Sequence, residues 1–567
     1  MTAHLRKPAI DALTEAGQRD HRLTADILII GSGGAGMYAA IEAARRGAAR
    51  ILLLDRSLIG RGGATIMAQM TVAAAIGRGD HWEHHLADTL TAGRGLCDPA
   101  LAALLCEVGA ECILEMDQWK VGWARSGEEF AAVQAPGHDR ARCVYVDFLS
   151  TGPAVSRTLR AQVQRAGPAI RRIGELAVTD LVVQEGRVTG AVALHIASGE
   201  AVTIAARATI IATGGLTRLY ARNSASANMS GDGYALAMRA GATLIDMEFV
   251  QFFPIGHLAP RLIGMDPIMW DPFRYKLGGR LLNGAMEEFL PRWGGDAEAG
   301  RYSTTRDLAT YAITKEAEAG RGSPHGGAWL SFAHLPEPEL RAAFGPVINK
   351  LAANGIDLTR DAIEVSPIAH YHMGGVRVDT AMRTDVPGLL AAGEAVGGAN
   401  GANRLSGNAI TEALAFGRIA GAEALRMAES GGGFDPAAAG SGLALLRAAG
   451  PAQNTAALVA RLQAIMSADV GPFRTEAGLF RARAALADLR AEAGMAPPGA
   501  PGTPHDLARL DWFDLRQMLL VAACVVQAAL ARTESRGAHQ REDFPGLDAA
   551  WHRNQALRLV DERLELA

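Results

Sequence analysis

The hydrophobic pattern near the N-terminus predicts a buried strand, a glycine-rich turn and a helix in succession. Residues 25–30 read ADILII, and GSGGAGMYAAIEAARRGA follows with apolar residues at helical spacing. A second apolar run, ARILLLDRS, predicts another buried strand that ends at Asp55. Continuous apolar runs of this kind are typical of parallel strands covered on both faces. This order of elements predicts an α/β fold with a Rossmann-like beginning.

The predicted turn contains the glycine spacing of dinucleotide-binding proteins. Gly31, Gly33 and Gly36 form GxGxxG, with Gly34 between them. Such glycines permit a tight turn, a close approach of the backbone to a pyrophosphate, and close packing of helix on strand. Asp55 stands about 20 residues further on, where an acidic side chain holds a ribose hydroxyl. Because strand and helix flank the motif correctly, the sequence predicts dinucleotide binding.

The pattern beyond this unit changes twice. From residue 172 to 206 the apolar residues alternate, as in a small antiparallel sheet, and ATIIATGGLTRLY then predicts another buried strand. After a Gly/Ala-rich break at 430–442, the remaining segments are apolar at helical spacing. The run LLVAACVVQAAL at 519–530 is shorter than the roughly 20 residues that cross a bilayer, so we expect a core helix and no transmembrane segment.

Composition limits the class of protein. The chain has 567 residues, 49% of them hydrophobic and 20% charged, which predicts two or three globular domains. A net charge of −4 without a block of like charges indicates a small-molecule partner and no nucleic acid. The five cysteines show no metal-ligand spacing, and the histidines at 81, 84 and 85 fit a solvated helix, so we expect no metal. With no secretory signal in the first 24 residues, a cytoplasmic location is expected.

A long segment, 370–411, contains most of the candidate chemistry. VPGLLAAGEA predicts a short strand that ends at Gly393, followed by Glu394, whose carboxylate can accept hydrogen bonds from the hydroxyls of a ribityl chain. GANRLSGNAIT then leads into a helix whose first N–H groups face whatever precedes them. His370 and Arg404 are the side chains that would meet a substrate anion.

The segment contains HYHMGG, VPGLLAAGEA and GANRLSGN, and the chain reads SGDGYALAMRAGATLIDMEFVQFFP earlier and ARTESRGAHQREDFP later. These five motifs resemble the flavoprotein subunits of succinate dehydrogenase and fumarate reductase, with L-aspartate oxidase and urocanate-type reductases as relatives. The resemblance extends over most of the chain. It implies a Rossmann-like FAD-binding domain, an inserted α+β capping domain and a C-terminal helical domain. The expected parts are a flexible arm at 1–24, the FAD domain at 25–245 and 365–430, the cap at 246–364, and the helical domain at 443–567.

The same resemblance implies FAD as cofactor. The family attaches FAD to a histidine in some members, and Ala64 stands at that position here, counted back from Ala68-Gln69, so a non-covalent FAD is expected. The residues implied in cofactor binding are Gly31, Gly33, Gly34, Gly36, Asp55, Ala64, Thr65, Gln69, Thr213, Gly214, Asp232, Glu394, Arg404, Ser406, Asn408 and Ile410.

Catalysis in the family moves a hydride between the flavin and a carbon next to a carboxylate, while a proton moves at the neighbouring carbon. The resemblance assigns His370 and Arg404 to the carboxylate clamp. Arg306 corresponds to the proton donor. An arginine is an unusual acid, and Arg306 could instead orient a water or pair with Asp307 at a helix start.

The substrate positions depart from the dicarboxylate pattern. Where the family reads FHPTG, this chain reads FFPIG, so Phe253 and Ile255 replace two polar residues. DPFRYKLGG places Asp271 and Tyr275 at the second carboxylate, or Arg274 if the loop shifts by one residue. His257 and Trp270 are further candidates for the same pocket. An aspartate repels a second carboxylate, so a monocarboxylate with a neutral or N–H-bearing end is expected.

Three functions remain open at this point. The first is an FAD-dependent oxidoreductase of a CH–CH or C=C bond beside a carboxylate. The second is an oxygen-using oxidase of the L-aspartate oxidase type, and the third is a non-catalytic electron relay. The presence of His370, Arg404 and Arg306 argues against a relay. Without an iron–sulfur cysteine set, a haem segment or an FMN segment, electrons must pass to a separate protein, a free reductant or oxygen.

Overall fold

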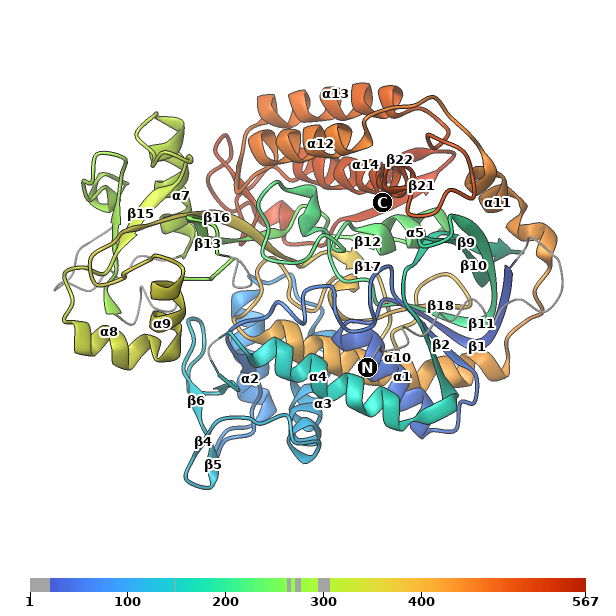
Figure 1. Ribbon diagram of the computed structural model, residues 1–567, viewed down its shortest axis with the longest axis horizontal. Coiled ribbons are helices and arrows are strands. Elements are labelled where there is room, and N and C mark those ends of the chain that lie inside the picture. Colours follow the sequence, from blue (N-terminus) through green and yellow to red (C-terminus); the bar gives the residue numbers. More distant parts are fainter. Residues whose placement is uncertain (1–20, 148, 263–266, 271–276, 294–305, 567) are drawn as a thin grey trace, which may run out of the picture.

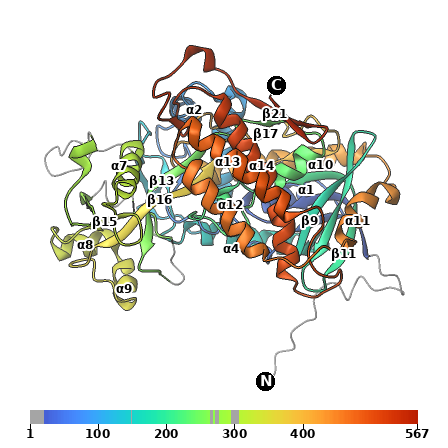
Figure 2. The same ribbon diagram turned by 90° about the horizontal axis from the view of Figure 1, so that it is seen from above.

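A computed structural model of the chain describes residues 21–147, 149–262, 267–270, 277–293 and 306–566, the last range without the side chains of 306, 307 and 346 (Figures 1 and 2). Both views place a smaller body at one end of the molecule, formed by the segments coloured yellow-green. The main body contains the described residues before 250 and the segment around α10 (Asn408–Glu429). The helices α12 (Thr455–Asp469), α13 (Glu476–Ala493) and α14 (Leu507–Ala531) cover its upper side in Figure 1.

The main body is built on a seven-stranded sheet in the order β8-β2-β1-β11-β10-β9, with β18 also paired to β11. The pairs β8–β2, β2–β1, β1–β11 and β11–β18 are parallel, as the continuous apolar runs predicted. β9, β10 and β11 form the expected antiparallel part. The strands are β1 (His21–Ile30), β2 (Ile51–Leu54), β8 (Ile170–Ile173), β9 (Leu176–Gln184), β10 (Arg187–His195), β11 (Glu200–Ile211) and β18 (Leu389–Ala391).

β1 begins four residues before the predicted start of the domain, because His21–Thr24 already pair with β11. Residues 1–20 of the predicted arm lie outside the described residues. The helices of the main body are α1 (Gly34–Arg45), α2 (Trp82–Ala92), α3 (Pro99–Gln118), α4 (Thr151–Arg165), α5 (Asp232–Arg239) and α10 (Asn408–Glu429).

α1 and α10 pack at very short distance because glycines on α10 face the backbone of α1. A Cβ atom at Gly421 would lie 2.3 Å from the carbonyl oxygen of Ala39, and one at Gly417 would lie 2.5 Å from that of Ala35. Only a residue without a side chain fits at such contacts. This packing keeps the first turn of α10 beside the glycine turn that precedes α1.

The smaller body is the cap. Its sheet has the order β13-β16-β15-β14 and is antiparallel throughout. Trp270, Phe332 and Phe344 pack together in its own hydrophobic core. The elements are β13 (Val250–Ala259), β14 (Arg280–Leu282), β15 (Ala328–Ser331), β16 (Ile363–His372), α7 (Arg306–Glu318), α8 (Glu337–Phe344) and α9 (Pro346–Ala353). The predicted end of the cap at residue 364 falls inside β16, which runs from the cap core to the main body.

The C-terminal part is helical until its last strands. It contains α11 (Gly440–Arg447), α12 (Thr455–Asp469), α13 (Glu476–Ala493), α14 (Leu507–Ala531), and then β21 (Ala556–Val560) and β22 (Arg563–Leu566). β21 extends a sheet of the main body through β12 (Leu244–Ile245) and β17 (Gly375–Val376). The helical expectation overlooked this hairpin. Short ribbons complete the fold: β3 (Val72–Ala73), β4 (Arg125–Ser126), β5 (Glu129–Phe130), β6 (Ala132–Val133), β7 (Cys143–Val144), β19 (Phe473–Arg474) and β20 (Gln540–Arg541).

The predicted apolar segment is part of a longer helix than expected. α14 has 25 residues, which by length and composition is enough to cross a membrane. In the structure 78% of its most apolar window is buried against the rest of the protein. The helix packs on α5, α12 and α13, as a core helix does.

We predict that Gly421→Ala destabilises the protein, because the added Cβ would press on the α1 backbone rather than on a flexible side chain. Overpacking of this kind costs about 1–3 kcal/mol. The measurement is the thermal unfolding midpoint of the FAD-loaded protein. Gly432→Ala is the matched control, since nothing lies within 4 Å of a Cβ at Gly432. Equal midpoints for the two variants would contradict the packing argument.

Candidate active site

A cavity of about 1090 Å³ lies where the sheet, the cap and the first turn of α10 meet. Pockets for small ligands and cofactors usually measure about 300–1,000 Å³, so this cavity is large enough for a dinucleotide with a small substrate beside it. Its wall comes from the β1–α1 turn, the segment 62–71, the loop 133–138, the turn after β11, and residues from β13, β16 and the start of α10.

The glycine turn forms one end of the cavity. Gly31 has φ +104°, and a Cβ there would lie 2.3 Å from the carbonyl oxygen of Ala212, so only glycine fits. Gly33 and Gly34 line the wall, and the Gly34 N–H donates to Thr65 Oγ1 at 3.0 Å. Gly36 does not line the cavity. A Cβ at Gly36 would lie 1.9 Å from the Gly31 oxygen, so its place is in close helix–strand packing.

Asp55 lines the same end of the cavity, and its carboxylate already accepts hydrogen bonds from the protein. Its Oδ1 accepts from the Ser57 N–H and Oγ–H, both at 2.8 Å, and its Oδ2 accepts from the Ser32 N–H at 3.0 Å and from the Ser32 hydroxyl. A carboxylate offers about four acceptor positions. A ribose hydroxyl would therefore have to share a position with one of these serines or replace it.

Two oxygen atoms on the wall have no hydrogen-bond partner among the described residues. They are Oγ1 of Thr213, just after β11, and Oδ1 of Asp232, at the start of α5. Burial raises the pKa of Asp232 to about 6, and nearby Arg56 opposes that rise. A buried polar atom left unsatisfied costs about 1–3 kcal/mol. A ligand with several hydroxyl and phosphate groups would supply the missing partners, so the residues present fit FAD.

Glu394 stands further along the wall, after Gly393 at φ +68°. Its Oε1 accepts from the His372 N–H at 3.1 Å. Burial raises the pKa of Glu394 to about 8, with Glu412 adding to the rise and Arg404 opposing it. At neutral pH this side chain is therefore largely protonated and can both donate and accept a hydrogen bond.

The remaining predicted cofactor residues divide into two groups. Ala64, Thr65, Gln69, Gly214, Ser406 and Ile410 all line the cavity. Asn408 does not, because its side chain points into the protein: its Oδ1 accepts from His85 at 2.8 Å and its Nδ2 donates to Thr89 at 3.1 Å. The roles of all these residues toward a cofactor stay predictions.

Gln69 joins the segment along the cavity to the cap. Its Nε2 donates to the carbonyl oxygen of Pro267 at 2.6 Å, and its Oε1 accepts from the Met269 N–H at 3.1 Å. Both partners also line the cavity. One amide side chain thus holds the cap against the main body at the wall of the site.

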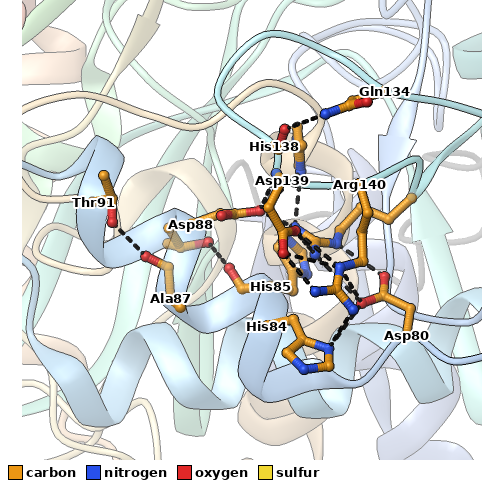
Figure 3. Close-up of polar contacts among 12 residues, drawn as sticks. Asp80, His84, His85, Ala87, Asp88, Thr91, Gln134, His138, Asp139 and Arg140 are labelled. Carbon is orange, nitrogen blue, oxygen red and sulfur yellow. Dashed lines mark hydrogen bonds and ion pairs between the residues drawn. The ribbon is translucent and has the colours of Figure 1, made fainter.

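The loop 133–138 is held by a buried charge network that the sequence reasoning missed (Figure 3). His138 Nε2–H donates to the carbonyl oxygen of Ser406 at 2.7 Å, and Arg142 Nη1 lies 3.2 Å from His138 Nδ1. Arg142 is 1% exposed and pairs with Asp80, Asp88 and Asp139. Most of these groups lie more than 50 residues apart in sequence, so no local motif marked them. Burial lowers the pKa of His138, which keeps its ring neutral.

The histidines at 81, 84 and 85 have separate partners. His84 Nδ1 lies 2.8 Å from Arg140 Nη1, and His85 contacts Asn408. Within the described parts of the chain, no three His, Cys, Asp or Glu side chains are arranged to hold a metal ion.

Phe253, His370 and Arg404 all line the cavity. The rings of Phe253 and His370 meet edge to face, with centroids 5.3 Å apart. His370 Nδ1 lies 2.7 Å from Ser224 Oγ, which fixes the orientation of the imidazole. Their strands, β13 and β16, pair directly, so the antiparallel register of the cap sheet places these two side chains next to each other.

Arg404 is held by neighbours on three sides. Its Nη2 donates to Gln251 Oε1 at 3.0 Å and its Nη1 to the carbonyl oxygen of Leu405 at 3.2 Å. The guanidinium carbon lies 4.4 Å from the centre of the Tyr371 ring, a cation–π contact. The side chain is 7% exposed, so its charge is shielded from solvent and directed by these contacts.

Beneath Tyr371 lies a second buried carboxylate that the sequence reasoning did not identify. Glu412 accepts a hydrogen bond from the Tyr371 hydroxyl and another from Asn400 Nδ2 at 2.9 Å. Burial raises the pKa of Glu412 to about 7, while these two hydrogen bonds and the charge of Arg404 oppose the rise. Arg404 therefore shares a water-poor region with two acids, Glu394 and Glu412, that titrate near neutral pH.

Other predicted substrate residues lie elsewhere or outside the description. His257 is 3% exposed in the cap, where its Nε2–H donates to Pro260 at 2.5 Å and its Nδ1 accepts from Trp270 at 3.1 Å. Neither ring lines the cavity, and Ile255 is buried in the cap core. Bulges in the pairing of β13 with β16 turn these side chains away from the cavity that Phe253 lines.

Asp271, Arg274 and Tyr275 lie outside the described residues. Arg306 begins α7, and its side chain is likewise outside the description. α7 packs against β13 and β16, the strands that bear Phe253 and His370. The roles of these four residues stay predictions.

Family comparisons agree with this architecture. An FAD binding domain family matches residues 26–410, and the fumarate reductase flavoprotein C-terminal family matches residues 459–565. The chain belongs to the succinate dehydrogenase/fumarate reductase flavoprotein family, with L-aspartate oxidase relatives. It is an FAD-dependent oxidoreductase of that type.

The similar proteins of this family are named for different activities. The chain is 32% identical to the fumarate reductase flavoprotein subunit of Escherichia coli, over 92% of this chain and 88% of that protein. It is also 33% identical to L-aspartate oxidase of Streptomyces coelicolor, over 97% and 95%. A variant of E. coli quinol fumarate reductase has the same fold, with a TM-score of 0.87 and 29% identity over 96% and 97% of the two chains. The predicted fold class is confirmed, and the substrate is not decided by these similarities.

We predict that carboxylate binding to the FAD-loaded protein becomes tighter as the pH falls from about 8 to about 6. Well above pH 8 both Glu394 and Glu412 are ionised around Arg404, and well below pH 7 both are neutral, because their pKa values are raised to about 8 and about 7. The local formal charge then rises from −1 to +1. Titration of the flavin absorbance with a simple monocarboxylate such as crotonate measures the dissociation constant at each pH.

Glu412→Gln removes one of the two titrating acids, so it should bind the ligand several-fold more tightly than wild type at pH 8 and show a flatter pH dependence. Glu423→Gln is the matched control, since Glu423 is a buried carboxylate of the same helix that pairs with Arg383 and Arg426 away from the cavity. An unchanged pH dependence in Glu412→Gln would refute this account of Arg404.

Proposed function

We propose that this flavoenzyme interconverts a CH–CH and a C=C bond next to the carboxylate of a small organic acid, and that its substrate is a monocarboxylate with a polar or N–H-bearing far end. The observation that carries the proposal is that Arg404, His370 and Phe253 all line one cavity, with the rings of Phe253 and His370 5.3 Å apart. A guanidinium and an imidazole suit one carboxylate, and an aromatic edge suits a flat, unsaturated or ring-bearing group.

The clamp is prepared before a substrate arrives. Arg404 is stacked on Tyr371 and bound to Gln251, and His370 is oriented by Ser224. Charge-assisted hydrogen bonds from such fixed donors are roughly twice as strong as neutral ones. Binding of the carboxylate also fixes the position of the adjacent carbon atoms. The entropy of bringing the reactants together is then lost on binding, so it no longer adds to the barrier of the reaction.

The far end of the substrate is the point at which the proposal departs from succinate and fumarate. Phe253 stands where the dicarboxylate enzymes have a histidine, and the aliphatic side chain of Ile255 lies in the cap core instead of at the cavity. Two polar partners for a second carboxylate are therefore absent among the described residues. Asp271, by the resemblance, adds a negative charge at that end, and an uncompensated buried charge costs several kcal/mol.

When bound, FAD would supply hydride transfer to or from one carbon of that CH–CH or C=C bond. Arg306, at the start of α7, is proposed to hold or deliver the proton at the neighbouring carbon. The protein's own contribution is thus to bind the carboxylate, to exclude water beneath the cap, and to keep the proton-bearing group close.

Non-covalent attachment of FAD is part of the proposal. Ala64 presents only a methyl group to the cavity at the attachment position of the family. His138 lines the cavity too, but each of its ring nitrogens already faces a partner, Ser406 on one side and Arg142 on the other. Its lone pair is therefore not directed at the cavity.

A second candidate function is oxidation of an amino acid or hydroxy acid with oxygen as acceptor. The 33% identity to an L-aspartate oxidase over 97% of this chain favours it. A clamp of His370 and Arg404 would serve that reaction as well. Hydrogen peroxide formation with candidate amino acids, against anaerobic reduction of unsaturated acids, distinguishes the two.

We predict that acid precipitation releases the flavin into the supernatant, because no nucleophilic side chain occupies position 64. The measurement is the flavin absorbance of pellet and supernatant. Ala64→His is the companion variant, since it restores the nucleophile. Flavin that stays with the wild-type pellet would disprove non-covalent attachment.

We predict that urocanate or a similar monocarboxylate reoxidises the anaerobically reduced protein faster than fumarate does. Phe253→Leu keeps the site apolar but removes the ring, so it should slow the aromatic acid by about 10-fold or more, corresponding to loss of an aromatic pair and its burial. The rate with fumarate should change little. Flavin reoxidation in a stopped-flow instrument measures both rates.

Asp271→Thr tests the other half of the pocket. If Asp271 repels a second carboxylate, the variant should gain activity with fumarate relative to wild type. A wild type that prefers fumarate, or a preference that neither variant alters, would show that the assignment of the far end is wrong.

A further inference from the structure

Two segments beside the cavity contain arginine and no acidic residue. Residues 56–79 contain three arginines, and residues 149–174 contain five, with neither Asp nor Glu in either segment. The whole chain has slightly more acidic than basic residues, 60 against 56. A local excess of positive charge in such a chain requires a physical explanation.

The fold brings the two segments together. A Cβ atom at Gly60 would lie 2.6 Å from Cγ of Arg160, so the aliphatic stem of Arg160 packs on the loop 57–61. Ser156 Oγ–H donates to the Gly60 carbonyl oxygen at 2.7 Å. Both contacts come from α4, which packs on α1 along the main body (Figure 1). The loop and one side of α4 therefore form a single surface.

We call Leu58, Arg61, Arg157 and Arg160 the arginine face. Arg61 and Arg157 are exposed, and Leu58, on the same loop as Arg61, is 62% exposed. Burial lowers the pKa of Arg160, and the positive charges of Arg61 and Arg157 lower it further. Nothing in the described part of the chain forms an ion pair with these three arginines.

Other arginines of this protein have their charge balanced by carboxylates. Arg56 pairs with Asp514 through both of its terminal nitrogens, each at 2.6 Å. Arg142 is surrounded by three aspartates. The arginine face lacks such partners within the described chain, so its like charges repel one another in the isolated protein. A negatively charged partner would relieve that repulsion.

The arginine face is the outer side of the cavity wall. Gly62, Gly63 and Ala64 follow Arg61 directly in the chain, and all three line the cavity. Gly63 has φ +81°, and no atom lies within 4 Å of a Cβ built there. A protein bound at the face would be separated from the bound flavin by this one loop.

We infer that the arginine face is the docking surface for a small acidic electron-carrier protein that supplies the electrons for the reaction. The inference rests on the proposed function. Conversion of a C=C into a CH–CH group takes up two electrons and two protons. A carrier that gives one electron per visit must therefore dock and be oxidised twice per turnover, while the protons come from water through the protein.

An acidic protein fits this face better than a membrane or a nucleic acid does. Leu58 is a single apolar side chain, whereas a membrane-bound face needs a larger apolar area to insert. The face combines arginines with one exposed leucine, and arginine is enriched where proteins meet. The face lies against the wall of the cofactor cavity, which would bring a docked electron donor close to the flavin. A nucleic acid would gain nothing from that position.

The experiment follows flavin reduction in the FAD-loaded protein by a pre-reduced acidic [2Fe–2S] ferredoxin, and by an acidic flavodoxin in a second series. Stopped-flow absorbance gives the second-order rate constant at several salt concentrations. A photoreduced deazaflavin serves as a small donor that needs no docking surface. Turnover with an unsaturated acid is measured with the same small donor.

Arg61→Glu combined with Arg157→Glu should reduce the carrier rate constant by about 10-fold or more at low salt, since electrostatic steering changes association rates by about 10–10³-fold. The same variant should keep its FAD content and its turnover with the small donor. Replacement of both residues by glutamine should give an intermediate loss. Raising the salt concentration should reduce the wild-type rate toward that of the variant.

The matched control is Arg461→Glu combined with Arg490→Glu, which makes the same change in net charge on α12 and α13. Those helices lie on the other side of the main body from α4 (Figure 1). Equal losses in the two double variants would mean that only net charge matters, and would overturn the docking surface.

Failure of the inference and failure of the proposed function give different results. Wild-type protein that turns over with the small donor, but is reduced by neither carrier, overturns the docking surface alone. Wild-type protein that shows no turnover with the small donor on any unsaturated acid refutes the proposed function. Binding of anionic vesicles or DNA that depends on Arg61 and Arg157, without a carrier effect, overturns the carrier and assigns the face to a different partner.

Discussion

The buried positive charge of Arg404 is the interaction on which the site depends. A guanidinium that is 7% exposed must be stabilised by the groups around it, and here these are the ring of Tyr371, the amide of Gln251 and the carboxyls of Glu394 and Glu412. Breaking one partner of a buried charge group commonly costs about 3–5 kcal/mol. Since the partners come from β13, β16, the segment after β18 and α10, the charge joins the cap sheet to the nucleotide-binding body.

β16 transmits this constraint between the two bodies. The strand begins at Ile363 in the cap core and ends at His372, whose N–H binds Glu394 at the cavity. Gln69 adds a second connection from the opposite wall. A movement of the cap would therefore displace His370 and the contacts around Arg404 together. The positions of His370 and of the groups around Arg404 are therefore coupled to the position of the cap.

What the sequence predicts well are features that local backbone geometry dictates. The glycine turn and the buried parallel strands follow from short local patterns, while cofactor contacts at Thr213, Glu394 and Ser406, which line the cavity, stay predictions. Groups that depend on distant pairing were missed. His138 reaches Ser406 across 268 positions, and Glu412 reaches Tyr371 across 41. Regular alternation along β13 would put His257 on the same face as Phe253, and the bulges that separate the two are not visible in the sequence.

The arginine face shows the same limit for electrostatics. The chain contains no block of like charges, and its net charge of −4 indicates no basic surface. Yet Arg61 lies about 100 positions from Arg157 and Arg160, and only the packing of α4 on the loop 57–61 makes them neighbours. In the sequence, this surface is marked by the two segments without acidic residues, 56–79 and 149–174. In the docking role proposed above, the acidic groups of the carrier would offset the repulsion that folding creates between these distant arginines.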